Sequence, residues 1–217
     1  MAAVTAAMVK ELRERTGLGM MDCKKALVES DGDMDLAIDN LRKSSGMKAA
    51  KKASRTAADG LIRIQMDGEK GLMVEVNCET DFAAKDENFI NFADQVIAAM
   101  FEAQSVDVES LMASGFEATR ESLVQKIGEN IGVRRIAAAR ADDGVVGAYV
   151  HGNKRIAVLV QLRGGDADLA KDVAMHVAAS RPQYAFESEV PADQVAHEKE
   201  ILMDQARQEG KPEEIVE

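Results

Sequence analysis

Apolar residues in the first fifty positions recur at helical spacing and predict three short helices. The first helix begins after Thr5, whose hydroxyl suits an N-cap, and ends at Gly17, which tolerates a left-handed backbone. The second runs from about Met21 to Val28, and the third begins after the N-cap candidate Asp33. Three helices in so few residues predict a small N-terminal module that, with a linker, spans residues 1–55.

Two later segments alternate apolar and polar positions, which is the pattern of half-buried β-strands. In the first, apolar residues alternate from Leu61 to Val76 around a turn at Asp67-Gly68. In the second, they alternate from Val145 to Val160 around a turn at His151-Gly152. Because glycine supplies the backbone that tight turns need, each segment predicts an antiparallel β-hairpin.

The two hairpins belong to an internal duplication. Asp59-Gly60 before the first hairpin is repeated by Asp143-Gly144 before the second, at an offset of 84 residues. A helical pattern follows each hairpin, from Phe89 to Phe101 and from Ala167 to Ser180. Self-similarity of this kind is typical of duplicated structural units. We therefore expect an α+β protein with a core of two related subdomains, residues 56–140 and residues 141–182.

The remaining periodic segments are helical. One further helix is expected over Val108–Ile127, between the two subdomains. Residues 183–217 are rich in charge, and Val195 and Leu202 lie a heptad apart. This segment is expected to be the first arm of a coiled-coil hairpin with an exposed apolar seam. The return arm has barely begun after Pro212, so the chain is interpreted as shortened at its C-terminus.

Composition and charge narrow the range of partners. The chain has 46% hydrophobic and 30% charged residues, as ordinary globular proteins do. Its formal charge of −11 repels phosphate backbones and anionic lipid surfaces, so neither nucleic acid nor a membrane is expected as a partner. Two cysteines cannot build a disulfide framework, and the N-terminus lacks a signal-peptide pattern. We expect a cytoplasmic protein with free thiols.

Signatures of bond chemistry are missing from the sequence. It contains no phosphate loop, no nucleophile elbow, no zinc-protease motif and no dinucleotide fingerprint, and we expect neither a metal nor a cofactor. The histidines His151, His176 and His197 are scattered over a turn and two helices. Two alternatives stay open: a metabolic α+β enzyme that uses Asp81, Cys78 or His151, and a ubiquitin-like adaptor or chaperone built on the N-terminal module.

One loop has a composition that packing alone does not explain. Residues 77–82 leave the first hairpin with Asp81 beside Phe82, in a segment where Asp and Thr favour a turn. The second copy has Gln161-Leu162-Arg163-Gly164-Gly165-Asp166 in its place, without an acid followed by a ring, so the fold itself does not require that pair. An aromatic ring on a loop predicts an anchor for a pocket of another protein, and packing onto its own core is the alternative.

Two long motifs resemble signatures of the translation elongation factor Ts family. The first covers Leu12–Leu27, and the second covers Glu75–Phe82 together with Lys85. Segments 126–130 and 149–152 agree as well, so the resemblance extends over essentially the whole chain. The chain departs from the family at Ala83, where valine is usual, which predicts looser support for the loop.

The resemblance implies a nucleotide exchange factor for the GTPase elongation factor Tu, without bond chemistry of its own. It also implies a ubiquitin-associated-like N-terminal module, a two-subdomain core and a helical hairpin. Asp81 and Phe82 would then enter the nucleotide domain of the GTPase as a wedge near its magnesium site. The other partner contacts that the resemblance implies are Lys10, Arg13, Met20, Met21, Lys24, Lys52, Thr80, Ile127, Gly128 and His151.

Overall fold

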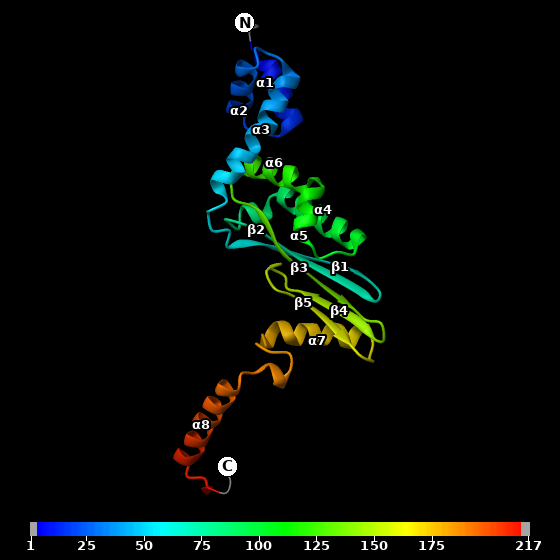
Figure 1. The fold of residues 1–217 in the computed structure, drawn as a ribbon, viewed down its shortest axis with the longest axis vertical. Coiled ribbons are helices and arrows are strands. Elements are labelled where there is room, and N and C mark those ends of the chain that lie inside the picture. Colours follow the sequence, from blue (N-terminus) through cyan, green and yellow to red (C-terminus); the bar gives the residue numbers. More distant parts are fainter. Residues whose placement is uncertain (1–3, 214–217) are drawn as a thin grey trace. The chain divides into compact units, whose positions relative to one another are not determined.

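The computed structural model describes residues 4–213, which belong to two compact units, Met1–Ala178 and Ala179–Glu217. The first unit begins with the three predicted helices, α1 (Ala6–Thr16), α2 (Met20–Glu29) and α3 (Met34–Lys52) (Figure 1).

The predicted caps of these helices are confirmed. The Thr5 hydroxyl accepts a hydrogen bond from Met8 N at 3.3 Å, and the Asp33 carboxylate accepts one from Leu36 N at 2.9 Å. The three helices enclose a small core of their own, built on buried side chains that include Leu12, Cys23, Leu27 and Ala37.

Helix α3 is longer than the N-terminal module requires. Its second half packs on α6 (Glu117–Ile127), where Gly46 lies against the side chain of Glu121 and Ala49 joins the main core. Because Ala49 packs into the main core, the helix continues through the segment between the N-terminal module and the first strand. The module and the core are joined by a packed helix.

A three-stranded antiparallel sheet forms the centre of the first unit. Its strands are β1 (Asp59–Asp67), β2 (Lys70–Cys78) and β3 (Gly132–Arg140), in the order β1-β2-β3. The first two form the predicted hairpin, with Asp67 paired to Lys70. Strand β3 was not predicted, because most of its residues are exposed along the sheet edge and give no clear apolar alternation.

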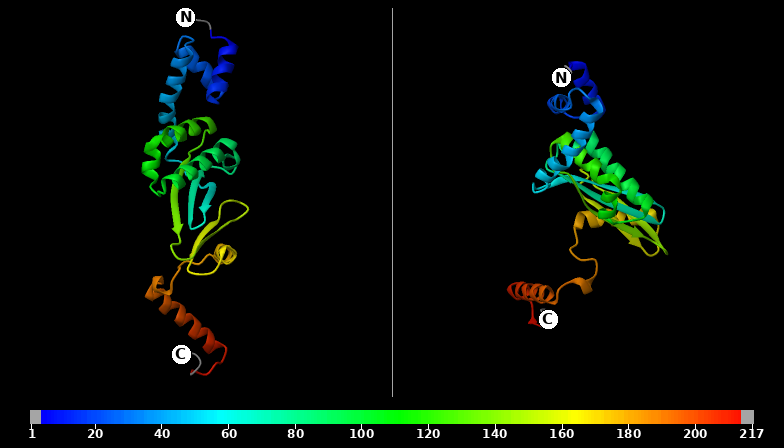
Figure 2. Two further views of the ribbon diagram at one scale, coloured as in Figure 1. Left: turned by 90° about the vertical axis from the view of Figure 1, so that its right-hand side faces the viewer. Right: turned by 45° about the horizontal axis from the view of Figure 1, so that its top comes forward.

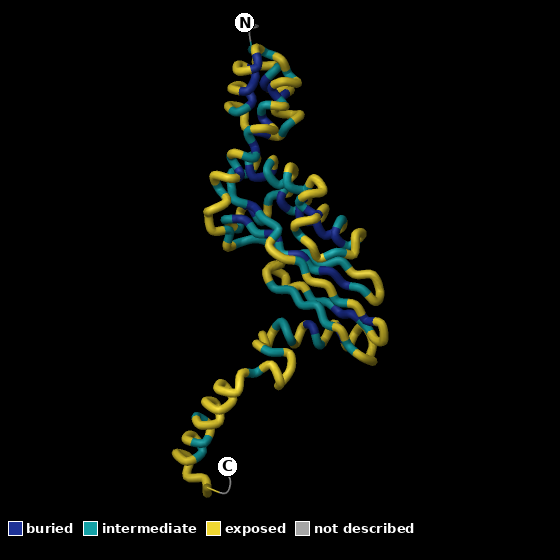
Figure 3. The backbone as a smooth tube through the Cα atoms, viewed as in Figure 1, coloured by how far each residue is buried: buried dark blue, intermediate teal, exposed yellow. Residues whose placement is uncertain are grey.

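Helices cover one face of this sheet and bury the main core against it (Figure 3). They are α4 (Glu87–Ala103), α5 (Val108–Leu111), the π-helical turn η2 (Met112–Phe116) and α6. One continuous helix was expected over Val108–Ile127. The structure breaks it at Gly115, whose φ of 115° does not fit a helix. Phe89, Phe92 and Val96 of α4 meet the buried residues of β2.

The second predicted hairpin, β4 (Val145–Val150) and β5 (Ala157–Leu162), lies on the other face of the sheet. At Gly71 of β2 the backbone approaches Leu159 and Val146 so closely that a Cβ would stand 3.0 Å from each. Helix α7 (Ala167–Ser180) packs outside this hairpin, with Ala170 against Gly147. The layers follow as helices, sheet, hairpin and helix (Figure 2).

The two hairpins share one unusual backbone feature. Gly60 has a φ of 146° and Gly144 a φ of 145°, and each opens the first strand of its hairpin. At both places a Cβ would collide with a carbonyl of the partner strand, that of Val76 in the first hairpin and that of Leu162 in the second. Only glycine fits such a position without strain.

The second unit contains the 3-10 turn η3 (Glu187–Glu189) and α8 (Ala192–Gln208), which confirms the expected helix. None of the α8 residues is buried, and Val195 and Leu202 are exposed. The predicted beginning of a return arm falls largely on residues 214–217, outside the described residues, as do Met1–Ala3. Within residues 4–213, no helix is long and apolar enough to cross a membrane.

Candidate functional site

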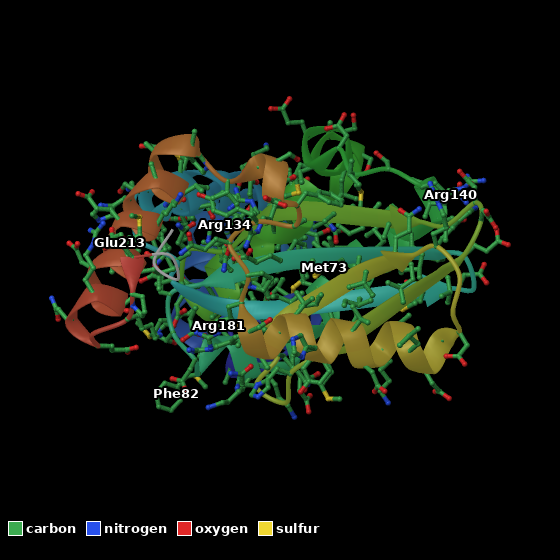
Figure 4. All side chains as sticks on the ribbon, turned by 90° about the horizontal axis from the view of Figure 1, so that it is seen from below. Met73, Phe82, Arg134, Arg140, Arg181 and Glu213 are labelled. Atoms are coloured by element: carbon green, nitrogen blue, oxygen red, sulfur yellow. The ribbon has the colours of Figure 1, made fainter. Side chains whose placement is uncertain are left out.

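The loop after β2 displays its aromatic residue. The strand ends at Cys78, the chain turns over Glu79–Phe82, and the 3-10 turn η1 (Ala83–Lys85) leads into α4. Phe82 is 81% exposed and stands out from the ribbon (Figure 4). Its ring therefore does not pack onto the core of its own chain, as the alternative interpretation required.

Lys85 contacts both residues at the tip of this loop. Its ammonium donates a hydrogen bond to Asp81 Oδ2 at 2.7 Å and lies 5.9 Å from the centre of the Phe82 ring. A cation over an aromatic face is attracted to it, and here the contact is solvent-exposed. The hydrogen bond from Lys85 lowers the pKa of Asp81 below its ordinary value. Asp81 is thus a carboxylate at neutral pH.

A second loop holds the first by an exchange of hydrogen bonds, which we call the loop latch. The Glu129 carboxylate accepts the backbone N–H groups of Glu79 and Thr80, both at 3.0 Å, and the Thr80 hydroxyl at 2.6 Å. In return, Glu79 Oε1 accepts the backbone N–H of Asn130 at 2.7 Å. That hydrogen bond lowers the pKa of Glu79, so the Glu79 side chain is a carboxylate at neutral pH.

The end of α3 anchors the same place. Lys52 Nζ donates to the Gly128 carbonyl oxygen at 2.5 Å, and the Asn130 side chain donates to the Arg55 carbonyl at 2.8 Å. Ile127 is half-buried against the main core. The structure therefore brings Lys52, Thr80, Ile127 and Gly128 together behind Asp81 and Phe82.

Beneath the loop the side chains are buried. Cys78 has no exposed surface and donates weakly through Sγ to the Thr80 carbonyl at 3.2 Å, and burial raises the pKa of its thiol to about 12. A thiol of this kind is a poor nucleophile at neutral pH. Ala83 is buried in the main core, so the methyl group at this position supports the loop from below.

His151 lies in the loop of the second hairpin and is exposed. Its ring meets that of Tyr149 edge-on, with 6.5 Å between the ring centres. The same hairpin loop borders a cleft of about 740 Å³ that reaches the Asp81 loop. Arg155 on this border pairs with Asp59 of β1. The polar side chains that line the cleft are Asp59, Asp81, Lys85, Asn153, Lys154 and Arg155.

The other five predicted contact residues occupy α1 and α2. Lys10 and Arg13 are exposed on α1, three residues apart and so on one side of the helix. Met20 and Met21 of α2 are 60% and 76% exposed, and Lys24 follows one turn later. This surface belongs to the N-terminal module, which packs around the beginning of α3, whereas Lys52 lies at the end of that helix (Figure 1).

Sequence reasoning did not single out Glu129, Glu79 or Asn130 as supports of the loop. Their hydrogen bonds join residues about fifty positions apart. They meet only because β3 begins at Gly132 and pairs with the end of β2 at Asn77. The available signal was a glutamate directly after the helix-ending Gly128, in a segment that agreed with the family.

The site offers exposed side chains on a well-braced loop. Across residues 4–213, no three His, Cys, Asp or Glu side chains lie close enough together to hold a metal ion. Glu79 and Glu129 are committed to backbone N–H groups, and the buried Cys78 thiol is protonated at neutral pH. A displayed ring and carboxylate above such supports are typical of a surface that binds another protein.

Comparison with known proteins specifies which factor. The family model described as elongation factor TS matches residues 79–217. Elongation factor Ts of Saccharophagus degradans is 59% identical over 216 residues, which cover 99% of this chain and 74% of the relative. The Hahella chejuensis protein of that name is 60% identical over 218 residues (100% and 76%), and that of Arthrospira platensis is 57% identical over 225 residues (100% and 90%).

The chain belongs to the elongation factor Ts family, which confirms the resemblance read from its motifs. It is a nucleotide exchange factor that binds elongation factor Tu in translation elongation, and it is not an enzyme. The family is one of soluble factors of the bacterial cytoplasm.

Proposed function

We propose that the loop over Glu79–Lys85 is the part of this exchange factor that drives GDP out of elongation factor Tu. Asp81 and Phe82 enter the nucleotide domain of the GTPase beside its magnesium site. The observation that carries this proposal is the 81% exposure of Phe82 on a loop that the latch and Lys85 brace from both sides. An exposed ring without an intramolecular pocket is available to a pocket of the partner.

Exchange of this kind needs differential binding and no bond chemistry. A factor that binds nucleotide-free GTPase more tightly than the GDP-bound form weakens GDP binding by the same factor, because linkage is reciprocal. A thousandfold weakening corresponds to about 4 kcal/mol of coupling. One buried aromatic anchor supplies about 2 kcal/mol or more of such energy. The Asp81 carboxylate brings a negative charge close to the magnesium site, where it disturbs the coordination of the ion.

The N-terminal module is proposed as a second, docking contact. Lys10, Arg13, Met20, Met21 and Lys24 present charged and adaptable apolar groups on α1 and α2, which suit a helix of the GTPase. They bind the partner and leave nucleotide release to the wedge.

The remaining implied contacts lie in or near the core. Lys52 donates a hydrogen bond to the carbonyl of Gly128. We propose that these two residues, with Thr80 and Ile127, maintain the shape of the surface that contacts the partner. His151 is proposed as a separate contact from the second hairpin.

The finer organisation is also a proposal. We propose that residues 1–55 form a ubiquitin-associated-like module with its connection to the core. Residues 56–140 and 141–182 are proposed as duplicated subdomains, supported by the matching backbones of Gly60 and Gly144. Residues 183–217 are proposed as the beginning of a coiled-coil hairpin, supported by the exposed seam of α8.

The test is the rate of GDP release from elongation factor Tu at saturating concentrations of the factor. Phe82→Ala should lower this maximal rate about thirtyfold, the equivalent of ~2 kcal/mol, and leave the melting temperature nearly unchanged because the ring is exposed. Phe186→Ala is the matched control, since Phe186 is 70% exposed in the second unit. A normal maximal rate for the Phe82 variant would refute the wedge.

A further inference from the structure

The two residues that precede the wedge leave the sheet and need new hydrogen-bond acceptors. Pairing of β1 with β2 ends at Asp59 and Cys78, so the N–H groups of Glu79 and Thr80 lie beyond that ladder. Unpaired backbone groups favour other conformations or water. The Glu129 carboxylate accepts both N–H groups, and each bond is charge-assisted and therefore stronger than one between neutral groups.

Thr80 relays this anchorage to the far side of the wedge. Its hydroxyl donates to Glu129 and at the same time accepts the backbone N–H of Ala83 at 3.3 Å. The Thr80 carbonyl accepts the N–H of Ala84 at 3.2 Å. Asp81 and Phe82 thus lie in a turn whose two ends are both connected to one carboxylate.

Glu129 is itself fixed in place. Its neighbour Asn130 donates its backbone N–H to Glu79, and its neighbour Gly128 accepts the ammonium of Lys52. The backbone on both sides of Glu129 is therefore held in place, by α3 through Lys52 and by the first loop through Glu79.

We infer that Glu129 is a positioning residue for nucleotide exchange, whose carboxylate holds the Asp81-Phe82 turn in its protruding conformation before the partner arrives. The inference rests on the proposed role of Phe82 as the wedge. A loop ordered in advance spends less binding energy on its own ordering, and more of that energy acts on the partner. Without the carboxylate, the turn samples other conformations and the wedge is presented less often.

The first experiment measures maximal GDP release from elongation factor Tu with Glu129→Ala and Glu129→Gln. Both variants should lower the saturated rate at least fivefold. Glutamine should lose less than alanine, because it retains one acceptor oxygen. Glu102→Gln on the exposed end of α4 removes the same charge away from the loop, and it should release GDP at the unaltered rate. An unchanged saturated rate in both Glu129 variants would overturn the inference.

A double-variant cycle separates positioning from a direct contact with the partner. If Glu129 acts through Phe82, adding Glu129→Ala to Phe82→Ala should lower the rate less than twofold further. An undiminished loss in that background would mean that Glu129 acts independently, and the inference would be wrong. A normal rate for Phe82→Ala alone would remove the wedge and this inference together. A slow Phe82 variant beside a normal Glu129 variant would remove only the inference.

Hydrogen exchange on the isolated factor gives a readout that needs no GTPase. In Glu129→Ala, which removes the acceptor of both bonds, the backbone amides of Glu79 and Thr80 should exchange at least ten times faster than in the unaltered chain, while those within β2 keep their protection. Thr80→Val, which removes the hydroxyl but keeps the shape, should release the Ala83 amide in the same way. Unchanged exchange at these amides in a folded Glu129 variant would contradict the positioning role.

Discussion

Met20 and Met21 provide a direct test of the proposed division between docking and nucleotide release. They are 60% and 76% exposed on α2, so both thioether chains are available to a partner. Replacing both by alanine keeps a strong helix former and leaves the buried Cys23 and Leu27 of the module untouched. The isolated protein should therefore keep its melting temperature within a few degrees.

The expected loss follows from the exposed area. Complete burial of a methionine side chain contributes ~1.5–3 kcal/mol relative to leaving it in water, and the exposed fractions leave roughly two thirds of that for the partner to bury. Alanine retains part of it, so the pair should lose about 2 kcal/mol of docking energy. That corresponds to a rise of about thirtyfold in the concentration of factor that gives half-maximal GDP release.

The assay titrates the factor against elongation factor Tu loaded with labelled GDP and separates half-saturation from maximal rate. The double variant should shift half-saturation and keep the maximal rate within twofold, because the wedge is intact. Met47→Ala is the matched control, a methionine of α3 with 65% exposure that is not among the implied contacts. A shift as large for Met47→Ala, or an unmoved half-saturation for the Met20/Met21 pair, would refute the docking role.

Two further predictions concern groups at the base of the loop. With its pKa raised to about 12, the Cys78 thiol should resist a disulfide reagent at pH 8 in the folded protein and react only after unfolding in urea; rapid labelling of native Cys78, located by peptide mapping, would contradict the buried position. The pKa of Glu79 is lowered below 4.5, so its contribution to stability is complete above that pH and is lost as the pH falls through the lower folded value. Glu79→Gln should therefore flatten the acid side of a plot of melting temperature against pH, and an unchanged acid slope would show that the Glu79 carboxylate contributes nothing to stability.

Local signals predicted much of the fold. The caps at Thr5 and Asp33 and the two hairpins depend on neighbours in the chain, and the structure contains all of them. Strand β3 was not predicted because it lies at the edge of the sheet. Its arginine and alanine residues do not show the apolar and polar alternation of a half-buried strand. The π-helical turn at Met112–Phe116 was equally invisible, because helical residues flank it and only the backbone of Gly115 departs.

The candidate site likewise has features that local sequence predicted and features that depend on distant residues. The contrast with the second copy, which lacks the pair of an acid and a ring, favoured a displayed Phe82, with packing onto its own core as the alternative, and the structure shows the ring exposed. The latch could not be predicted, because Glu129 reaches Glu79 and Thr80 only through the strand that the pattern missed. The same holds for Lys52, which was expected only as a partner contact and whose ammonium donates a hydrogen bond to the carbonyl of Gly128, at the end of a different helix.

The most direct measurement of the whole account is the release of labelled GDP from purified elongation factor Tu as this 217-residue chain is added. The release rate should rise with the concentration of the chain and then saturate, and the saturated rate should be much lower when Phe82 is replaced by alanine. A release rate that stays at its spontaneous value at every concentration of the unaltered, folded chain would contradict the account.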